Sequence, residues 1–150
     1  MPLQPPSKVR QAIIDESLSW VGTPYHAQAH LKGIGVDCIG LIIGVAKAVG
    51  VLAPTYRPPI YSQEWHWHSN EELLQETLTL MQCPCLPVGQ HQPGDMLVFQ
   101  YGRVSSHVGI VLPEGLLVHA VRDDGRVVAQ RLTEALQGRL RAAYAFPGVL

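Results

Sequence analysis

The sequence has few charged residues and no run of Lys or Arg. Charged side chains make up 15% of its 150 residues, and the formal net charge is −1, whereas soluble proteins carry roughly 25% charged residues. Without a basic patch, neither nucleic acid nor an anionic membrane surface is expected as a partner. The low charge content also suggests that another protein or a second copy of the chain covers part of the surface.

Cysteine is scarce, and very long apolar stretches are missing. Three cysteines in no framework pattern predict free thiols, and no stretch is long enough to span a bilayer. Residues 1–10 lack the apolar core of a signal peptide, so synthesis in the cytoplasm is expected, with export only by a carrier. The length suits a single domain, residues 1–150, in which residues 1–6 form a loose tail.

The longest apolar stretch begins at Cys38 and ends at Gly50. It carries one charged residue, which is typical of a helix buried on all sides, and a terminal glycine is a helix stop signal. Asp37 is a natural N-cap, which places Cys38 in the first helical turn. Because unpaired N–H groups there favour a thiolate, Cys38 is a candidate nucleophile. The alternative is a small buried hydrophobic residue.

Helices precede strands along the chain. Ser7 is expected to cap a helix that runs to about Val21. After the central helix, residues 53–91 are predicted to form an insertion with an aromatic loop and one helix, which a capping box of Ser69 and Glu72 opens. Turn signals then separate five strands, expected at residues 96–101, 106–112, 116–121, 126–132 and 141–146. This order predicts an α+β fold with one antiparallel sheet.

Two histidines, His107 and His119, lie inside apolar strands, where a polar ring needs a partner. A thiol nucleophile needs a base and a group that orients the base. The two rings share a face only if the loop between them has three or five residues centred on Pro113, or if a bulge intervenes; Gly115 suits the positive φ of such loops. We then expect both rings on the sheet face that receives the N-terminus of the Cys38 helix, with the Cys38 sulfur about 3–4 Å from a His107 ring nitrogen. Two unrelated histidines on a solvent-facing surface are the alternative.

Five short motifs, taken in order, resemble the NlpC-type cell-wall peptidases, a papain-like family, and in particular its branch in phage tail gene clusters. The motifs are Gly22-Thr23-Pro24-Tyr25, Val36-Asp37-Cys38-Ile39-Gly40-Leu41, Gln92-Pro93-Gly94-Asp95, His107-Val108-Gly109-Ile110 and Val118-His119-Ala120. The closing segment, residues 141–147, resembles the ending of that branch. The resemblance implies a papain-like α+β fold, with the nucleophile at the start of a buried helix packed on an antiparallel sheet.

The resemblance also implies a cysteine peptidase with a Cys–His–His triad and neither metal nor cofactor. In it, Cys38 is the nucleophile, His107 the base and His119 the orienting residue. Tyr25 matches a tyrosine that binds substrate or lines the oxyanion hole, and Asp37 matches an acidic residue that meets the free amine of the substrate. The implied substrate is the stem peptide of bacterial peptidoglycan, commonly cleaved between D-glutamate and the following diamino acid. A phage tail would carry the protein to the wall.

Two features depart from the family pattern. Ile39 follows the nucleophile where the family often has serine, which puts the specificity pocket in question. The gap between Cys38 and His107 is also long, and its aromatic loop carries Trp65 and Trp67. These rings either stack on a sugar or hold an extra layer of structure together, and we favour the second interpretation.

Three other functions compete with the peptidase. A structural tail-tip component with a secondary or vestigial hydrolase site would suit the low charge content, and an unreactive Cys38 would favour it. A zinc site would use His66, His68, Cys83 and Cys85, although their spacing is not that of usual zinc sites. A non-hydrolytic acyl transferase on the same fold ranks lower because the sequence shows no membrane anchor.

Overall fold

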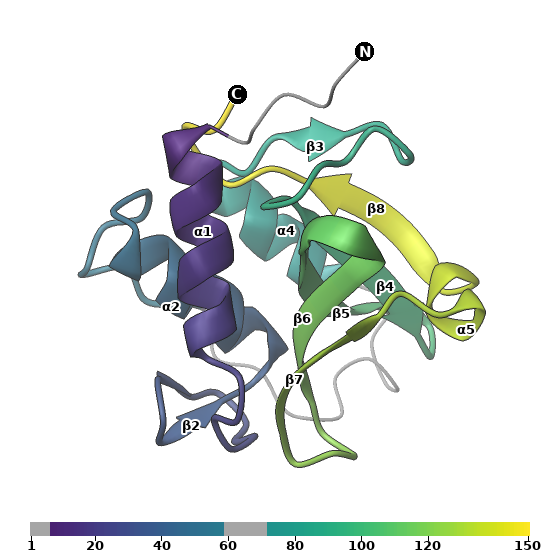
Figure 1. Cartoon of the computed structure of the whole chain (residues 1–150), viewed down its shortest axis with the longest axis horizontal. Helices are drawn as coiled ribbons and strands as arrows, with labels where there is room; N and C mark the ends of the chain where they lie inside the picture. Colours follow the sequence, from purple (N-terminus) through teal and green to yellow (C-terminus); the bar gives the residue numbers. More distant parts are fainter. Residues whose placement is uncertain (1–6, 59–71) are drawn as a thin grey trace.

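A computed structural model describes residues 7–58 and 72–150. Three helices, α1 (Lys8–Ser19), α2 (Cys38–Ala48) and α4 (Leu73–Leu80), pack beside a six-stranded antiparallel sheet (Figure 1). The sheet has the strand order β3-β8-β4-β5-β6-β7. Its strands are β3 (Cys85–Leu86), β4 (Met96–Tyr101), β5 (Val104–Val111), β6 (Leu116–Val121), β7 (Arg126–Arg131) and β8 (Leu140–Tyr144). The predicted α+β fold is confirmed.

Four smaller elements complete the described part of the chain. A two-stranded sheet of β1 (His30–Leu31) and β2 (Gly35–Val36) leads into α2, a 3-10 turn η1 (Pro113–Gly115) joins β5 to β6, and α5 (Glu134–Gln137) precedes β8. The sequence pattern indicated a plain loop before α2, because a two-residue strand is too short to alternate. None of the helices in the described ranges combines the length and hydropathy that a membrane crossing requires.

Two of the three expected helix caps form as predicted. Ser7 Oγ accepts the backbone N–H of Arg10 at 3.2 Å, and Asp37 Oδ1 accepts that of Gly40 at 2.8 Å. Helix α4 instead begins with Glu72 at the N-cap position, and this side chain makes no capping bond. Its carboxylate accepts the backbone N–H of Ser105 at 3.0 Å, which ties α4 to β5. The expected cap Ser69 and the aromatic residues Trp65 and Trp67 lie outside the described residues.

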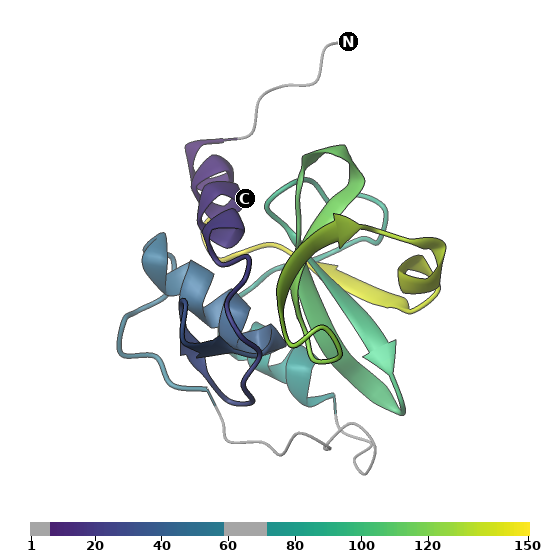
Figure 2. The same ribbon diagram turned by 60° about the horizontal axis from the view of Figure 1, so that its bottom comes forward.

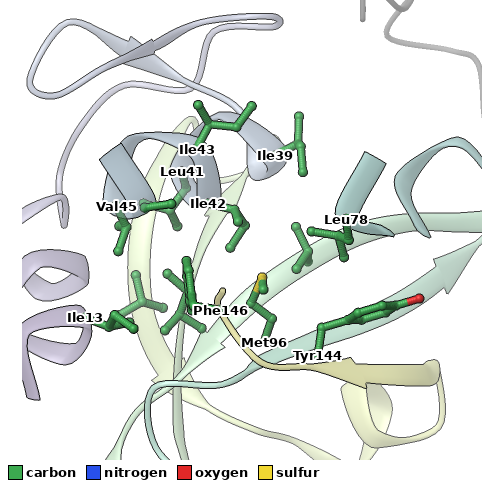
Figure 3. Close-up of a cluster of buried hydrophobic side chains, with 14 of the residues drawn as sticks. Ile13, Ile39, Leu41, Ile42, Ile43, Val45, Leu78, Met96, Tyr144 and Phe146 are labelled. Carbon is green, nitrogen blue, oxygen red and sulfur yellow. The ribbon is translucent and has the colours of Figure 1, made fainter. Parts of the chain in front are cut away.

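Alternate residues of the sheet face two hydrophobic cores. The main core lies between the sheet and α1, α2 and α4, and side chains such as Ile13, Ile42, Leu78 and Met96 meet there (Figure 3). A smaller core on the opposite face contains Leu97, Phe99, Leu117, Leu136 and Ala143. The sheet is therefore covered on both faces, and a strand residue's place in the alternation decides which core it joins.

Helix α2 approaches its neighbours closely because of its glycines. A Cβ added at Gly44 would lie 2.4 Å from two ring carbons of Trp20, which is 3% exposed and donates its Nε1–H to Glu16 at 2.8 Å. Because the ring is buried and hydrogen-bonded, it cannot move aside easily. Gly44→Ala should therefore lower the free energy of unfolding by about 1–3 kcal/mol in urea denaturation.

A matched control is Gly138→Ala, whose added Cβ would lie 3.5 Å from its nearest neighbour, an ordinary contact distance. That variant should leave the free energy of unfolding within about 0.5 kcal/mol of the parent. Equal stability of the Gly44 and Gly138 variants would contradict the proposed close packing of α2 on Trp20.

Candidate active site

The loop between the two histidine strands has three residues, as predicted, but a different centre. Ile110 pairs with Val118, the Leu112 N–H bonds the Leu116 carbonyl at 2.9 Å, and Pro113–Gly115 forms the turn. The predicted centre at Pro113 is wrong, because the loop is centred on Glu114. The turn is thus displaced by one residue from the prediction. Glu114 and Gly115 both have positive φ, +66° and +74°.

This register makes His107 and His119 diagonal neighbours on one face. Beyond the last pair, Ile110–Val118, the next residues of the two strands are Gly109 and His119, and His107 lies two residues beyond Gly109. The ring centroids lie 5.0 Å apart, and His107 Nε2 is 2.7 Å from His119 Nδ1. The two rings are therefore directly hydrogen-bonded. This contact excludes the alternative of two unrelated histidines on a solvent-facing surface.

The face that carries the histidines differs from the prediction. Val108 and Val118, the neighbours of the two histidines, join the main core together with α2, so alternation directs the histidines to the opposite face. There the His107 ring lies 5.9 Å, centroid to centroid, from both Phe99 and Tyr101. The expectation that both rings lie on the face that receives α2 was wrong.

Cys38 approaches His107 at the edge of β5 instead. Within the described residues, β5 and β6 pair at Ile110–Val118 and Val111–Leu117 and then diverge, so the hairpins β4–β5 and β6–β7 splay apart (Figure 2). The start of α2 lies against this part of β5. The Cys38 thiol donates to the Ser106 carbonyl at 3.7 Å, and the Val108 N–H also faces the sulfur.

The sulfur thus contacts the backbone on either side of His107. A direct contact between the sulfur and the His107 ring stays a prediction. The ring nitrogen that remains for it is Nδ1, because Nε2 is engaged by His119.

Burial of the thiol and of the imidazole opposes the charged form of each group. Burial and, to a smaller extent, the Asp37 carboxylate raise the pKa of the Cys38 thiol to about 12, against the opposite effect of nearby backbone N–H groups. Burial, followed by the neighbouring His119, lowers the pKa of His107 to about 3. Desolvation therefore opposes the stabilising effect of the helix N-terminus on a thiolate.

Tyr25 is held beside the thiol by backbone pairing. Its N–H donates to the Gly125 carbonyl at 2.8 Å, and it bridges to Val36, just before α2. Burial raises the pKa of the Tyr25 hydroxyl, and the Cys38 and Asp37 groups add to this rise. The hydroxyl consequently stays protonated and can donate a hydrogen bond to a developing negative charge.

Asp37 is 2% exposed and organises the start of α2. Besides capping Gly40, its carboxylate accepts the backbone N–H of Gln28 at 2.7 Å. The cap is confirmed, whereas binding of a substrate amine stays a prediction. Ile39 is 5% exposed and packs into the main core, so its side chain contributes to packing in this structure.

Gln130 is a site residue that the sequence analysis missed. Its Oε1 lies 3.0 Å from Nε2 of His119. Gln130 follows, by two residues, the position opposite His119 on β7, which is Val128. The available signal was a glutamine in the strand that follows His119. It could be used only with the register of the β6–β7 hairpin.

The residues of the alternative zinc site divide between described and undescribed parts of the chain. Cys83 is buried, Cys85 is exposed, and both are free thiols, as is Cys38. His66 and His68 lie outside the described residues. Among residues 7–58 and 72–150, no three His, Cys, Asp or Glu side chains gather in a way that could hold a metal ion.

Comparison with known proteins identifies the family. The model of the NlpC/P60 family matches residues 22–143. The chain belongs to the NlpC/P60 family. One relative, named "Probable endopeptidase Rv2190c", from Mycobacterium tuberculosis (strain ATCC 25618 / H37Rv), is 29% identical over 111 residues, which are 74% of this chain and 23% of the relative. The chain therefore spans less than a quarter of that protein.

Solved structures share the fold. An NLP/P60-family protein similar to lipoprotein from Staphylococcus aureus Mu50 matches 97% of this chain and 44% of its own, with a TM-score of 0.65 and 22% identity. The NlpC/p60 domain of the peptidoglycan hydrolase SagA matches 91% of this chain and 98% of its own, with a TM-score of 0.63 and 19% identity. The α+β architecture is therefore that of other NlpC/P60 proteins.

Proposed function

We propose that the protein is a cysteine peptidase that hydrolyses an amide bond in the stem peptides of bacterial peptidoglycan. The observation that carries the proposal is the hydrogen bond between His107, on the strand whose edge contacts the Cys38 thiol, and His119 on the neighbouring strand. Family membership supports it, as do relatives named as endopeptidases and peptidoglycan hydrolases.

The chemistry is acyl transfer in two steps. Cys38 Sγ attacks the amide carbon while its proton passes to His107 Nδ1, and His119 stabilises the charged ring. The Cys38 N–H, two residues before the Gly40 N–H that Asp37 caps, and the Tyr25 hydroxyl are the proposed donors to the oxyanion. His107 then protonates the leaving amine, and water hydrolyses the thioester to release the new carboxylate and the free thiol.

The proposed bond lies between D-glutamate and the diamino acid that follows it. The family resemblance supports this choice, with Asp37 as the group that meets a free substrate amine. The test is to incubate the protein with purified stem peptides of defined sequence and to locate the cleaved bond by mass spectrometry. Cleavage at D-glutamyl–diamino acid bonds is expected, and cleavage at another bond would overturn this specificity while leaving the thiol mechanism intact.

A thiol mechanism needs no metal ion. Hydrolysis should therefore survive a chelator and cease when iodoacetamide modifies Cys38. The chelator is tested on the parent, because Cys85 belongs to the competing metal site, and iodoacetamide is tested on Cys85→Ser, because Cys85 is exposed whereas Cys83 is buried. Loss of hydrolysis with the chelator and retention after complete Cys38 alkylation would shift the assignment to a metal site that includes His66 and His68.

We further propose that a phage tail delivers the protein to the cell wall. The phage-branch motifs of the sequence and the 15% content of charged residues support this delivery. Purified tail particles should contain the protein when they are probed with a specific antiserum. Its absence from tails, with abundant free protein in the same lysate, would contradict tail delivery.

A further inference from the structure

Gln130, on β7, extends the row of polar side chains beyond the proposed triad. The β6–β7 register sets Gln130 opposite Leu117 and Val128 opposite His119, so alternation places the Gln130 side chain on the same face as His119. Gln130 Oε1 lies 3.0 Å from His119 Nε2, and His119 Nδ1 lies 2.7 Å from His107 Nε2. Three side chains on three adjacent strands therefore form one hydrogen-bonded chain.

The amide oxygen at one end determines where each proton sits. An amide oxygen can only accept a hydrogen bond, so His119 must donate from Nε2. A neutral imidazole carries one N–H, which makes His119 Nδ1 the acceptor in its contact with His107. His107 must therefore donate from Nε2, and its Nδ1 is left with the lone pair that a base requires.

The opposite proton arrangement would leave the base unable to work. If His119 carried its proton on Nδ1 and donated to His107, the His107 proton would sit on Nδ1. That nitrogen would then have no lone pair to receive the Cys38 proton. The distance of 2.7 Å allows either direction, so the choice depends on what His119 Nε2 meets at its other end.

We propose that Gln130 is a positioning residue that fixes the tautomers of His119 and His107, so that His107 Nδ1 can accept the proton of Cys38. This inference rests on the proposed peptidase function. When the proton moves from Cys38 Sγ to His107 Nδ1, His119 Nδ1 accepts from the charged His107 ring. The Gln130 oxygen continues to accept from His119 Nε2.

The test compares Gln130→Leu, which has no acceptor, with Gln130→Glu, which can only accept. Gln130→Leu should lower kcat about 100-fold and leave KM within about 2-fold. This loss is smaller than the roughly 10⁴-fold loss known when a triad's orienting residue selects the wrong tautomer. Gln130→Glu should retain kcat to within about 10-fold of the parent. It should also shift the acid limb of the pH profile upward, because a carboxylate favours protonated rings. The control is Gln137→Leu on α5, which should leave kcat unchanged.

Histidine ¹⁵N NMR reads the tautomers without any substrate. The parent and Gln130→Glu should show His107 and His119 protonated on Nε2, and Gln130→Leu should show a mixture of tautomers at His119. Protonation of His107 on Nδ1 in the parent would overturn the inference. Unchanged tautomers together with unchanged kcat in Gln130→Leu would overturn it as well. Since the parent spectrum needs no hydrolysis, a failure of the proposed peptidase function is distinguishable from a failure of this inference.

Discussion

Replacing Cys38 with alanine should lower kcat for stem-peptide hydrolysis by about 10⁶-fold, the loss typical when a nucleophile is removed from a catalytic triad. The proposed reaction has no covalent intermediate without the sulfur. The free energy of unfolding should change by about 1 kcal/mol or less, because the lost thiol is small and half-buried at the start of α2. Stopped-flow or discontinuous product assays measure the first effect, and urea denaturation measures the second.

The matched control is Cys83→Ala. Cys83 is 5% exposed and belongs to the main core, so its loss should lower stability by more than the loss of Cys38 and leave kcat near that of the parent. Full activity of Cys38→Ala would remove Cys38 from the proposed mechanism. An inactive but folded Cys83→Ala would show that the assay responds to something other than the nucleophile.

Replacing His107 with alanine should lower kcat by about 10²- to 10⁴-fold, the contribution typical of general acid–base catalysis. The effect should be large because burial raises the pKa of the Cys38 thiol, so that its attack requires a base. KM should change little, because the ring is assigned to proton transfer. His91→Ala, in the loop before β4, is the control and should retain the parent kcat.

The pH profile of the parent follows from His107 and Cys38. His107 acts as a base in its neutral form, and its pKa is lowered from 6.5 to about 3. Activity should therefore persist as the pH falls below 6.5 and disappear only as the pH approaches the lowered pKa. The rate of Cys38 alkylation distinguishes this neutral pair from a resting thiolate–imidazolium pair. The ion pair would give an alkylation rate that reaches a plateau above an acidic thiol pKa, and observation of that plateau would contradict the neutral pair.

The free energy of unfolding, like the activity, should fall as the pH is lowered. In the unfolded chain His107 takes up a proton near its ordinary pKa of 6.5, whereas the folded protein keeps it neutral to about pH 3. The unfolded state therefore binds more protons between these values, and the free energy of unfolding should fall as the pH is lowered through this window. The dependence should weaken in His107→Ala.

Strong local patterns made much of the fold predictable. The run after Cys38 is apolar on all sides, and it forms α2 with Asp37 as its cap. The strands at residues 96–101 and 116–121 were predicted to the residue, because turn signals bound them. Strands of two residues and the four-residue α5 were missed, since such short segments show no periodicity.

The site was predictable in composition but not in arrangement. Alternation predicts that His107 and His119 share a face once the loop has an odd number of residues, yet it does not fix the loop centre. The electrostatic environment of Cys38 was not predictable, because burial and the Asp37 carboxylate, which oppose a thiolate, become visible only when the chain is folded. Gln130 requires the register of a second hairpin, which no local motif encodes.

The most direct test of the proposed mechanism is the mass of protein quenched in acid during turnover of a stem peptide. The mechanism predicts an increase equal to the acyl half of the substrate, located on the tryptic fragment 33–47, which contains Cys38. A covalent adduct on another residue would contradict the mechanism. So would steady hydrolysis by protein whose Cys38 is completely carboxamidomethylated.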